Sequence, residues 1–372
     1  MYMWPTEVLK GLLNEARSLV ANMAIIQLIV AFRAIVDVIG LPGNLLVIAT
    51  VSVERRFHTV PYVLLASLAV SDELCLTAIN TYTLDCMIQA KWLYSETVCH
   101  LHSYFSRYFY INTVLHLVAV SYERYRAIVK EPMTYDGTMS KYKMMYMALL
   151  WIIPIPLCIG PFFGWGAYVY NPNLFLCEQG WSVQSESQMG ITVFFGVLFF
   201  ALPFLFILFL NWSIFKTASR IQQNELVPQH MLNSNESQNE AVARRIRDRK
   251  AAVDVSIVVG AFLVCFIPIW TVGVCRQTMK NTEDVPVLAI MIAYAIMMVN
   301  SMVNPIIYSI RKQAFRDGVK KMMRRIGFLP RSNTGDNGIM NRNEIGTNNQ
   351  GRSDALPLGT SSMQQQSPIQ TQ

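Results

Sequence analysis

Charged residues are scarce in this chain, and their scarcity argues against an ordinary soluble protein. Asp, Glu, Lys and Arg make up 15% of the 372 residues, whereas hydrophobic residues make up 53%. Soluble domains carry about 25% charged residues, so this composition, combined with long uncharged runs, favours a membrane protein. The net charge of +7 does not indicate nucleic acid, because the basic residues lie between the apolar runs. We expect a lipid bilayer as a partner and no nucleic acid.

Several chemical signatures are missing as well. The sequence has no zinc-ligand spacing, no phosphate-binding loop and no internal repeat of helical-pair length. It also lacks the nucleophile or metal cluster that an integral-membrane enzyme needs. We therefore expect no enzymatic activity, no catalytic residue and no metal site apart from the sodium ion considered below.

Seven apolar runs are present instead, each long enough for the roughly 20 residues that cross a hydrocarbon core. They predict an all-α membrane protein, a bundle of seven transmembrane helices. After the last run, apolar residues at helical spacing among basic ones predict a short amphipathic helix at about 311–323, lying on the membrane surface. The runs lie at about 24–53, 60–88, 98–128, 143–165, 189–216, 250–275 and 285–309.

Domain boundaries and orientation follow from the segments around the runs. Residues 1–23 precede the bundle, residues 24–325 form it, and residues 326–372, rich in Asn, Gly, Ser and Gln, are expected to be a disordered tail. Lys and Arg are concentrated in the segments after runs one, three, five and seven. The positive-inside rule therefore places the N-terminus outside the cell and the tail in the cytoplasm. We expect a multi-pass protein of the plasma membrane.

Each run contains a short motif, and the order of the motifs is informative. They are Gly43-Asn44, Leu68-Ala69-Val70-Ser71-Asp72, Glu123-Arg124-Tyr125, Trp151, Pro203, Cys265-Phe266-Ile267-Pro268 and Asn304-Pro305-Ile306-Ile307-Tyr308. Together, in this order, they resemble the rhodopsin-like (class A) family of G-protein-coupled receptors over about residues 24–325. The stretch Gly164-Trp165-Gly166-Ala167-Tyr168 adds a weaker resemblance to opsins and some of their orphan relatives.

The resemblance implies a receptor that senses an extracellular ligand and activates a heterotrimeric G protein through a rearrangement of helices. Arrestin and receptor kinases are further expected partners. By this resemblance Arg124 is held by Glu123 and Asp248 at rest and is then freed to meet the G protein. The same charges could instead be plain interfacial anchors. The residues expected to couple and switch are Glu123, Arg124, Tyr125, Asp248, Asn304, Pro305 and Tyr308.

One ionisable residue, Asp72, lies deep in the second run, where it needs polar partners. Small polar residues at similar depth in other runs could form a hydrated pocket for a sodium ion, as in similar receptors. They could equally form a plain interhelical hydrogen-bond network, and both interpretations stay open at this point. The set is Asp72, Asn44, Thr113, Asn300, Ser301 and Asn304.

The expected ligand pocket is aromatic and weakly polar, as small-molecule pockets often are. Ser106 stands where amine receptors of the family carry an Asp, so we expect a ligand other than a monoamine. Met298 stands where opsins carry the retinal-binding Lys, and run seven contains no Lys, so we expect no covalent retinal and no other cofactor. The expected pocket residues are His102, Ser106, Arg107, Tyr110, Trp181, Phe195, Phe199, Phe266, Trp270, Tyr294 and Met298.

Two residues depart from the family pattern at the switch. Phe266 stands where the family usually has Trp, so the residue below the ligand is smaller and lacks an indole donor. Asn211 stands where run five usually has a Tyr that joins Tyr308 through water in active receptors. These departures predict weaker or biased coupling.

Cysteine usage fits a protein of the cell surface. Cys99 opens the third run on the outer side, and Cys177 lies in the loop before the fifth run. Both face the oxidising side, so we expect them to form a disulfide that pins this loop over the bundle. The other five cysteines lie in or near the runs and are expected to be reduced.

Two alternative functions stay open. A seven-span transporter or channel would need ionisable residues along a path, and Arg33, Asp37, Asp72 and His116 do not form a chain. A retinal-independent relative of the opsins, with weak or constitutive coupling, would share the motifs described above. Ion flux without any G-protein response would favour the transporter.

Overall fold

The computed structural model describes residues 6–131, 134–164, 167–179, 196–225, 257–276, 285–311, 313–328 and 330. The chain divides into two units, Met1–Leu329 and Pro330–Gln372, and the fold below is that of the first. Asp248, Trp181 and Phe195 lie outside the described residues, as does the side chain of Phe199. Most of the expected tail also lies outside them, so its disorder stays a prediction, as do the domain boundaries at 23 and 325.

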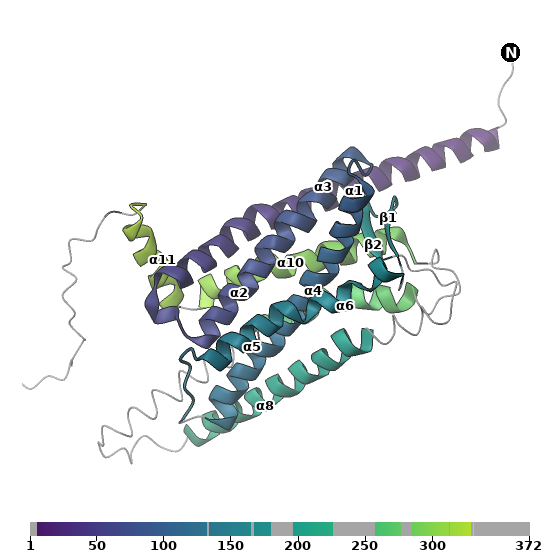
Figure 1. Cartoon of the computed structure of the whole chain (residues 1–372). Coiled ribbons are helices and arrows are strands. Elements are labelled where there is room, and N and C mark those ends of the chain that lie inside the picture. The colour runs from purple at the N-terminus through teal and green to yellow at the C-terminus, as the bar shows by residue number, and fades with distance from the viewer. Residues whose placement is uncertain are drawn as a thin grey trace, which may run out of the picture. The chain divides into compact units, whose positions relative to one another are not determined.

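Helices dominate the first unit, and the long ones lie beside one another in a bundle (Figure 1). Turns of π-helix at Leu76–Asn80 and Arg126–Lys130 continue α2 and α4, and a third at Val197–Ala201 leads into α8. Short 3-10 turns lie at Arg55–Phe57 and Gly160–Phe163. The helices are α1 (Thr6–Val53), α2 (Val60–Cys75), α3 (Thr81–Gln89), α4 (Glu96–Tyr125), α5 (Lys141–Ile152), α6 (Pro154–Cys158), α8 (Leu202–Glu225), the helix Ile257–Arg276, α10 (Val287–Arg311) and α11 (Gln313–Arg325).

Six helical segments of the described chain are long and apolar enough to cross a membrane. The seventh expected span, α4, has 30 residues but contains polar side chains such as His102, Asn112 and His116. Those three side chains are buried, which places their side of α4 against other parts of the bundle rather than against lipid. The six apolar segments and α4 correspond to the seven expected runs. The six are Met23–Val53, Val60–Gln89, Lys141–Phe163, Leu202–Arg220, Ile257–Arg276 and Val287–Arg311.

Helix α1 begins earlier than the sequence predicts. Its apolar segment, Met23–Val53, agrees with the expected run at 24–53, but the helix itself starts at Thr6. The added turns contain four Leu, two Glu and two Ala, which are good helix formers. This continuation contains charged residues, so the length of the uncharged run does not indicate it.

Two glycines of α1 allow close contact with neighbouring helices. A Cβ atom on Gly43 would lie 2.9 Å from Cγ of Pro305 in α10, and one on Gly40 would lie 2.6 Å from a methyl carbon of Leu76. Small residues at such crossings let helix backbones approach in membrane bundles. Residues of the first and seventh motifs, Gly43 and Pro305, therefore touch directly.

A short antiparallel hairpin lies at the end of the bundle opposite α11 (Figure 1). Its strands are β1 (Tyr168–Asn171) and β2 (Leu176–Gln179), with Tyr168 opposite Gln179. The Asn171 side chain accepts a hydrogen bond from the backbone N–H of Asn173 at 3.0 Å, which supports the turn between the strands. The expectation of helices alone missed this hairpin. We call this end of the bundle the hairpin end, and the other the α11 end.

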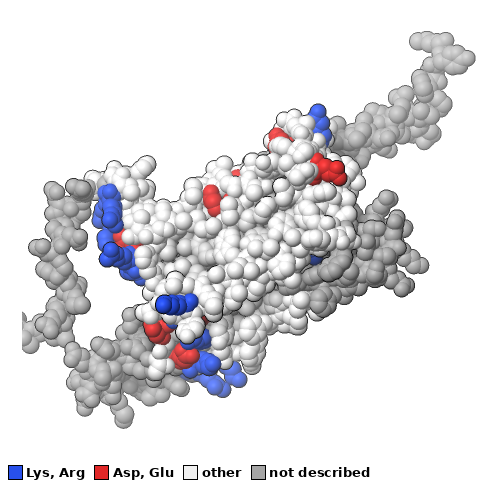
Figure 2. Space-filling view, in the orientation of Figure 1, with Lys and Arg blue, Asp and Glu red and all other residues white. Residues whose placement is uncertain are grey.

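Charge is distributed unevenly between the two ends. Figure 2 shows Lys and Arg gathered mainly at the α11 end of the visible face, with a broad, largely uncharged band between the ends. Helix α11 itself buries Phe315, Gly318 and Met322 and exposes most of its basic residues. A Cβ atom on Gly318 would lie 2.6 Å from the ring of Phe57, so the glycine permits close docking of α11. The amphipathic helix expected at about 311–323 is present.

Candidate functional site

A disulfide ties the hairpin to the start of α4. The Ser95 hydroxyl caps α4 by accepting a hydrogen bond from the backbone N–H of Val98 at 3.4 Å. Cys99 lies in this first turn of the helix. Cys99 and Cys177 of β2 form a disulfide, with their Cα atoms 5.4 Å apart. The expected pairing is confirmed. Among the other described cysteines, Cys86, Cys158 and Cys265 are buried and Cys75 is half-buried, and their reduced state stays a prediction.

The residue after Cys177 is a buried carboxylate that sequence reasoning missed. Glu178 accepts hydrogen bonds from both terminal nitrogens of Arg276, each at 3.0 Å. It also accepts from Tyr294 Oη at 3.2 Å and from Asn171 Nδ2 at 2.8 Å. Four donated hydrogen bonds stabilise the charged carboxylate away from water. Glu178 therefore joins the hairpin to the end of the helix Ile257–Arg276 and to Tyr294 of α10.

His102 of α4, expected in the ligand pocket, contacts the hairpin instead. Its Nδ1 lies 3.3 Å from the carbonyl oxygen of Cys177. Its Nε2 lies 3.2 Å from the Thr83 hydroxyl and 3.3 Å from the carbonyl oxygen of Ile79. Both ring nitrogens thus have protein partners, so His102 positions α3 and β2 and is poorly placed to bind a ligand.

Aromatic rings form a column below the hairpin end. The ring of Tyr110 lies 5.3 Å from that of Phe266, which in turn lies 4.4 Å from that of Phe262. Trp270 packs against the same core cluster. Such ring pairs contribute about 0.5–1.5 kcal/mol each beyond the area they bury. The column connects expected pocket residues with Phe262, deep in the bundle.

The other expected pocket residues that the structure describes lie on α4 and α10. Met298 is buried in a second cluster with Tyr108 and Phe109, against which Tyr110 also packs, and Ser106 and Arg107 are half-buried on α4. Tyr294 contacts Glu178 as described above. The structure therefore brings Tyr110, Phe266 and Trp270 into one cluster, and Tyr110 also packs against the cluster that contains Met298.

Asp72 forms the centre of a buried polar network. Its two carboxylate oxygens accept hydrogen bonds from Ser301 Oγ and Asn304 Nδ2, both at 2.9 Å. Asn44 Nδ2 donates to the backbone carbonyl of Ser301 at 2.9 Å, and its own Oδ1 is buried with no hydrogen-bond partner among the described residues. Thr113 and Asn300 are also buried, but no hydrogen bond of their side chains joins this network within the described part of the chain.

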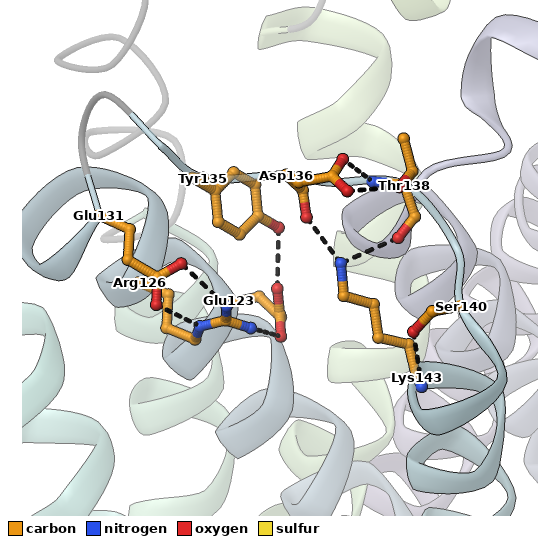
Figure 3. Close-up of polar contacts among 8 residues, drawn as sticks. All are labelled: Glu123, Arg126, Glu131, Tyr135, Asp136, Thr138, Ser140 and Lys143. Atoms are coloured by element: carbon orange, nitrogen blue, oxygen red, sulfur yellow. Dashed lines mark hydrogen bonds and ion pairs between the residues drawn. The ribbon is translucent and has the colours of Figure 1, made fainter.

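The charged cluster at the C-terminal end of α4 has unexpected partners (Figure 3). Glu123 accepts a hydrogen bond from Tyr135 Oη at 2.8 Å and pairs with Arg126 at 3.5 Å. Arg126 in turn donates to both oxygens of Glu131, at 3.3 and 2.9 Å. Burial and the hydrogen bond to Glu123 raise the pKa of Tyr135, which keeps its hydroxyl protonated as a donor.

This geometry corrects the expected pairing of Glu123 with Arg124. Residues three apart lie on the same face of a helix, whereas adjacent residues point about 100° apart, so Arg126 is the better partner. Arg124 is half-buried, and its side chain has no hydrogen bond or ion pair with any residue that the structure describes. Its other expected partner, Asp248, lies outside that part of the chain.

The loop after this cluster is braced by short-range hydrogen bonds (Figure 3). Asp136 accepts from the backbone N–H and the hydroxyl of Thr138, which lowers the pKa of the Asp136 carboxyl. Lys143 donates to the carbonyl oxygens of Asp136 and Thr138, at 2.6 and 2.9 Å. Thr138 also pairs with Thr59 in an isolated bridge, so the loop that carries Tyr135 is held beside the start of α2.

Asn211 of α8 lies where the sequence pattern departs from the family. It donates to the carbonyl oxygen of Ile207 at 2.8 Å and to the Ser121 hydroxyl at 3.4 Å. Tyr308 is buried in the main core cluster with Phe262 and Val114. The direct partner of Asn211 on α4 is therefore Ser121, one turn from Arg124.

Comparisons with known proteins agree with this architecture. Octopamine receptor beta-1R of Drosophila melanogaster is 27% identical over 311 residues, a match that covers 76% of this chain and 58% of that receptor. Trace amine-associated receptor 5 of Rattus norvegicus is 30% identical over 319 residues, covering 84% of this chain and 90% of the receptor. These relatives are named for amines, so they do not support the expectation that excluded a monoamine ligand.

A solved structure and a family model complete the assignment. The crystal structure of squid rhodopsin matches with a TM-score of 0.71 at 22% identity, covering 82% of this chain and 87% of that one, which supports the fold. The family model described as 7 transmembrane receptor (rhodopsin family) matches residues 43–308, most of the chain. The chain belongs to the rhodopsin family of seven-transmembrane receptors.

Proposed function

We propose that this protein is a plasma-membrane receptor that binds an extracellular ligand and activates a heterotrimeric G protein. The observation that carries the proposal is the placement of Arg124 at the C-terminal end of α4, half-buried and without a carboxylate partner among the described residues. A guanidinium fixed at the end of a central helix can bind a G protein when neighbouring helices rearrange. Arrestin and receptor kinases are proposed as further partners on the same side.

The proposed orientation places the α11 end in the cytoplasm. Lys and Arg gather at that end, as the positive-inside rule requires for cytoplasmic segments. The disulfide Cys99–Cys177 lies at the hairpin end, which suits the oxidising outer side. The N-terminus, at the start of α1, would then be extracellular.

The ligand is proposed to be a small molecule, and amines are the first class to test. Two relatives are named for octopamine and for trace amines, although Ser106 supplies no carboxylate at the position where amine receptors of the family carry an Asp. An amine would need another anionic partner, and the buried Glu178 beside Tyr294 would have to exchange one of its four present hydrogen bonds to serve as one. The rings of Tyr110 and Phe266, with Trp270 packed against the same cluster, would supply apolar contact.

A sodium ion at Asp72 is part of the proposal, and covalent retinal is not. Hard cations prefer oxygen ligands, and Asp72, Ser301 and the unpartnered Asn44 Oδ1 offer carboxylate, hydroxyl and amide oxygens. If bound, the ion would neutralise the buried carboxylate. Retinal attachment requires an amine, and Met298 offers none.

The proposed function can be tested in cells that express the protein with a panel of G-protein sensors. Octopamine and a set of trace amines would be applied, and the signal without ligand would be recorded. We expect at least one G-protein class to respond, either to a ligand or without one. An ion current through the expressed protein, with no response from any sensor, would contradict the receptor and favour a transporter.

A further inference from the structure

Arg33 of α1 is a buried cation that the proposed function does not use. It is 3% exposed and lies within the apolar segment Met23–Val53, where an ionisable side chain is costly and needs partners. Its Nε donates to Asn80 Oδ1 at 2.7 Å, and its Nη1 lies 3.9 Å from the sulfur of Met87, a weak acceptor. A guanidinium has more N–H donors than these two contacts use, and the others have no acceptor among the described residues.

The amide of Asn80 stands between Arg33 and a carboxylate. Asn80 is the last residue of the π-helical turn that continues α2. Its Nδ2 donates to Asp37 Oδ1 at 2.7 Å, while its Oδ1 accepts from Arg33. Arg33 and Asp37 are one helical turn apart, but they form no direct ion pair in the described part of the chain. Asp37 therefore balances the charge of the guanidinium without occupying its terminal nitrogens.

The guanidinium of Arg33 reaches the apolar cluster beneath the hairpin. Met87, its sulfur contact, is buried in one cluster with Leu176 of β2, and Tyr294 packs against the same cluster. Arg33 and Tyr294 are close enough to interact electrostatically. Tyr294 also donates to Glu178 at 3.2 Å. A buried cation and a buried carboxylate therefore lie near the same tyrosine, which is one of the residues expected to line the ligand pocket.

We propose that Arg33 binds the carboxylate of an extracellular ligand, so that this receptor recognises an amino acid rather than the corresponding monoamine. A planar guanidinium presents paired N–H donors that match the two oxygens of a carboxylate. A monoamine has no such group, and its positive charge would be repelled by Arg33. Ser106, at the position where amine receptors of the family carry an Asp, also leaves a monoamine without its usual partner. The inference depends on the proposed function, because it names the chemical class of that receptor's ligand.

The test measures ligand binding to the purified receptor in lipid nanodiscs, without a G protein. The probes are matched pairs of an amino acid and its amine: phenylalanine and phenethylamine, tyrosine and tyramine, tryptophan and tryptamine. The carboxamides of the three acids keep the size of the carboxylate but lack its charge. We expect at least one acid to raise the melting temperature of the receptor. That acid should bind about tenfold or more tightly than its amine or its carboxamide.

Variants of Arg33 connect this preference to one side chain. Arg33→Gln should abolish the preference for the acid, because a neutral amide cannot replace the charged fork. Arg33→Lys should keep part of it, since Lys retains the charge but not the paired donors. Lys91→Gln removes an exposed basic residue just after α3 and should leave the preference unchanged. If Arg33→Gln does not fold, the comparison of acid with carboxamide on wild type still decides the question.

The outcomes separate this inference from the proposed function. Binding of none of the three acids, carboxamides that bind as tightly as the acids, or a preference for the acid that survives in Arg33→Gln would overturn the inference. If amines alone bind and the G-protein sensors respond to them, the inference is wrong and the receptor function stands. If an acid binds through Arg33 but no sensor responds to it or without it, the inference stands and the proposed coupling is wrong.

Discussion

Glu178 and Arg276 join the hairpin to the end of a transmembrane helix. Arg276 grips the Glu178 carboxylate with two hydrogen bonds of 3.0 Å, and both side chains are nearly buried, at 6% and 11% exposure. Glu178 follows Cys177 directly, so a covalent and an ionic tie occur side by side on β2. The disulfide therefore connects the hairpin to α4, and the ion pair connects it to the helix Ile257–Arg276.

Glu178→Gln should loosen the hairpin and destabilise the receptor. Breaking a buried ion pair by removing one partner typically costs about 3–5 kcal/mol, because the other charge is left uncompensated. We expect a lower melting temperature and faster amide hydrogen exchange over residues 168–179. The matched control is Glu96→Gln, since Glu96 is 87% exposed in its weak pair with His100. Exchange in Glu178→Gln as slow as in this control would show that the ion pair does not hold the hairpin.

Replacing either cysteine of the disulfide should have the same effect as replacing both. Cys99→Ser and Cys177→Ser should each reduce delivery to the cell surface, and the double variant should be no worse than either alone. Cys75→Ser, which removes a thiol that forms no disulfide, is the control. Losses that add in the double variant would contradict a shared role of the two cysteines.

The Asp72 network should make signalling sensitive to sodium. If a sodium ion binds the Asp72 carboxylate with Ser301, replacing choline chloride by sodium chloride at constant ionic strength should lower the ligand-free signal of wild type. Asp72→Asn removes the charge that holds the ion and should abolish the difference between the salts. Equal signals of wild type in both salts would indicate a plain hydrogen-bond network.

Retinal should form no covalent adduct with this protein. The position of Met298 offers no amine for a Schiff base, and α10 contains no Lys. Purified protein incubated with retinal and reduced with borohydride should carry no retinyl group, whereas an opsin treated in parallel should. A retinyl-lysine mapped by mass spectrometry, together with a light-dependent G-protein response, would contradict this expectation.

Much of the fold could be predicted from the sequence, because uncharged length is a strong signal in a membrane protein. The second run, expected at 60–88, corresponds to Val60–Gln89, and the seventh, expected at 285–309, corresponds to Val287–Arg311. The early start of α1 was missed because it contains charged residues, and the hairpin was missed because its strands are short. The turn residues Pro172 and Asn173 between two short runs were an available signal for the hairpin.

The contacts within the candidate site were harder to predict, because the three-dimensional arrangement of the helices and loops decides which side chains pair. The spacing of Glu123 and Arg126 is that of neighbours on a helix face, so their pairing could have been found. The two hydrogen bonds from Arg126 to Glu131 depend on a π-turn, which no pattern of apolar or charged residues indicates. Glu178 meets Arg276 across 98 residues, and only the folded hairpin brings them together.

The most direct measurement of the central claim is nucleotide exchange on purified heterotrimeric G proteins. Wild type and Arg124→Ala, reconstituted in lipid nanodiscs at equal concentration, would be compared with empty nanodiscs across representative G-protein classes. We predict that wild type accelerates exchange on at least one class and that Arg124→Ala falls to the rate of empty nanodiscs. An Arg124→Ala variant that accelerates exchange as much as wild type would contradict the account of how this receptor couples.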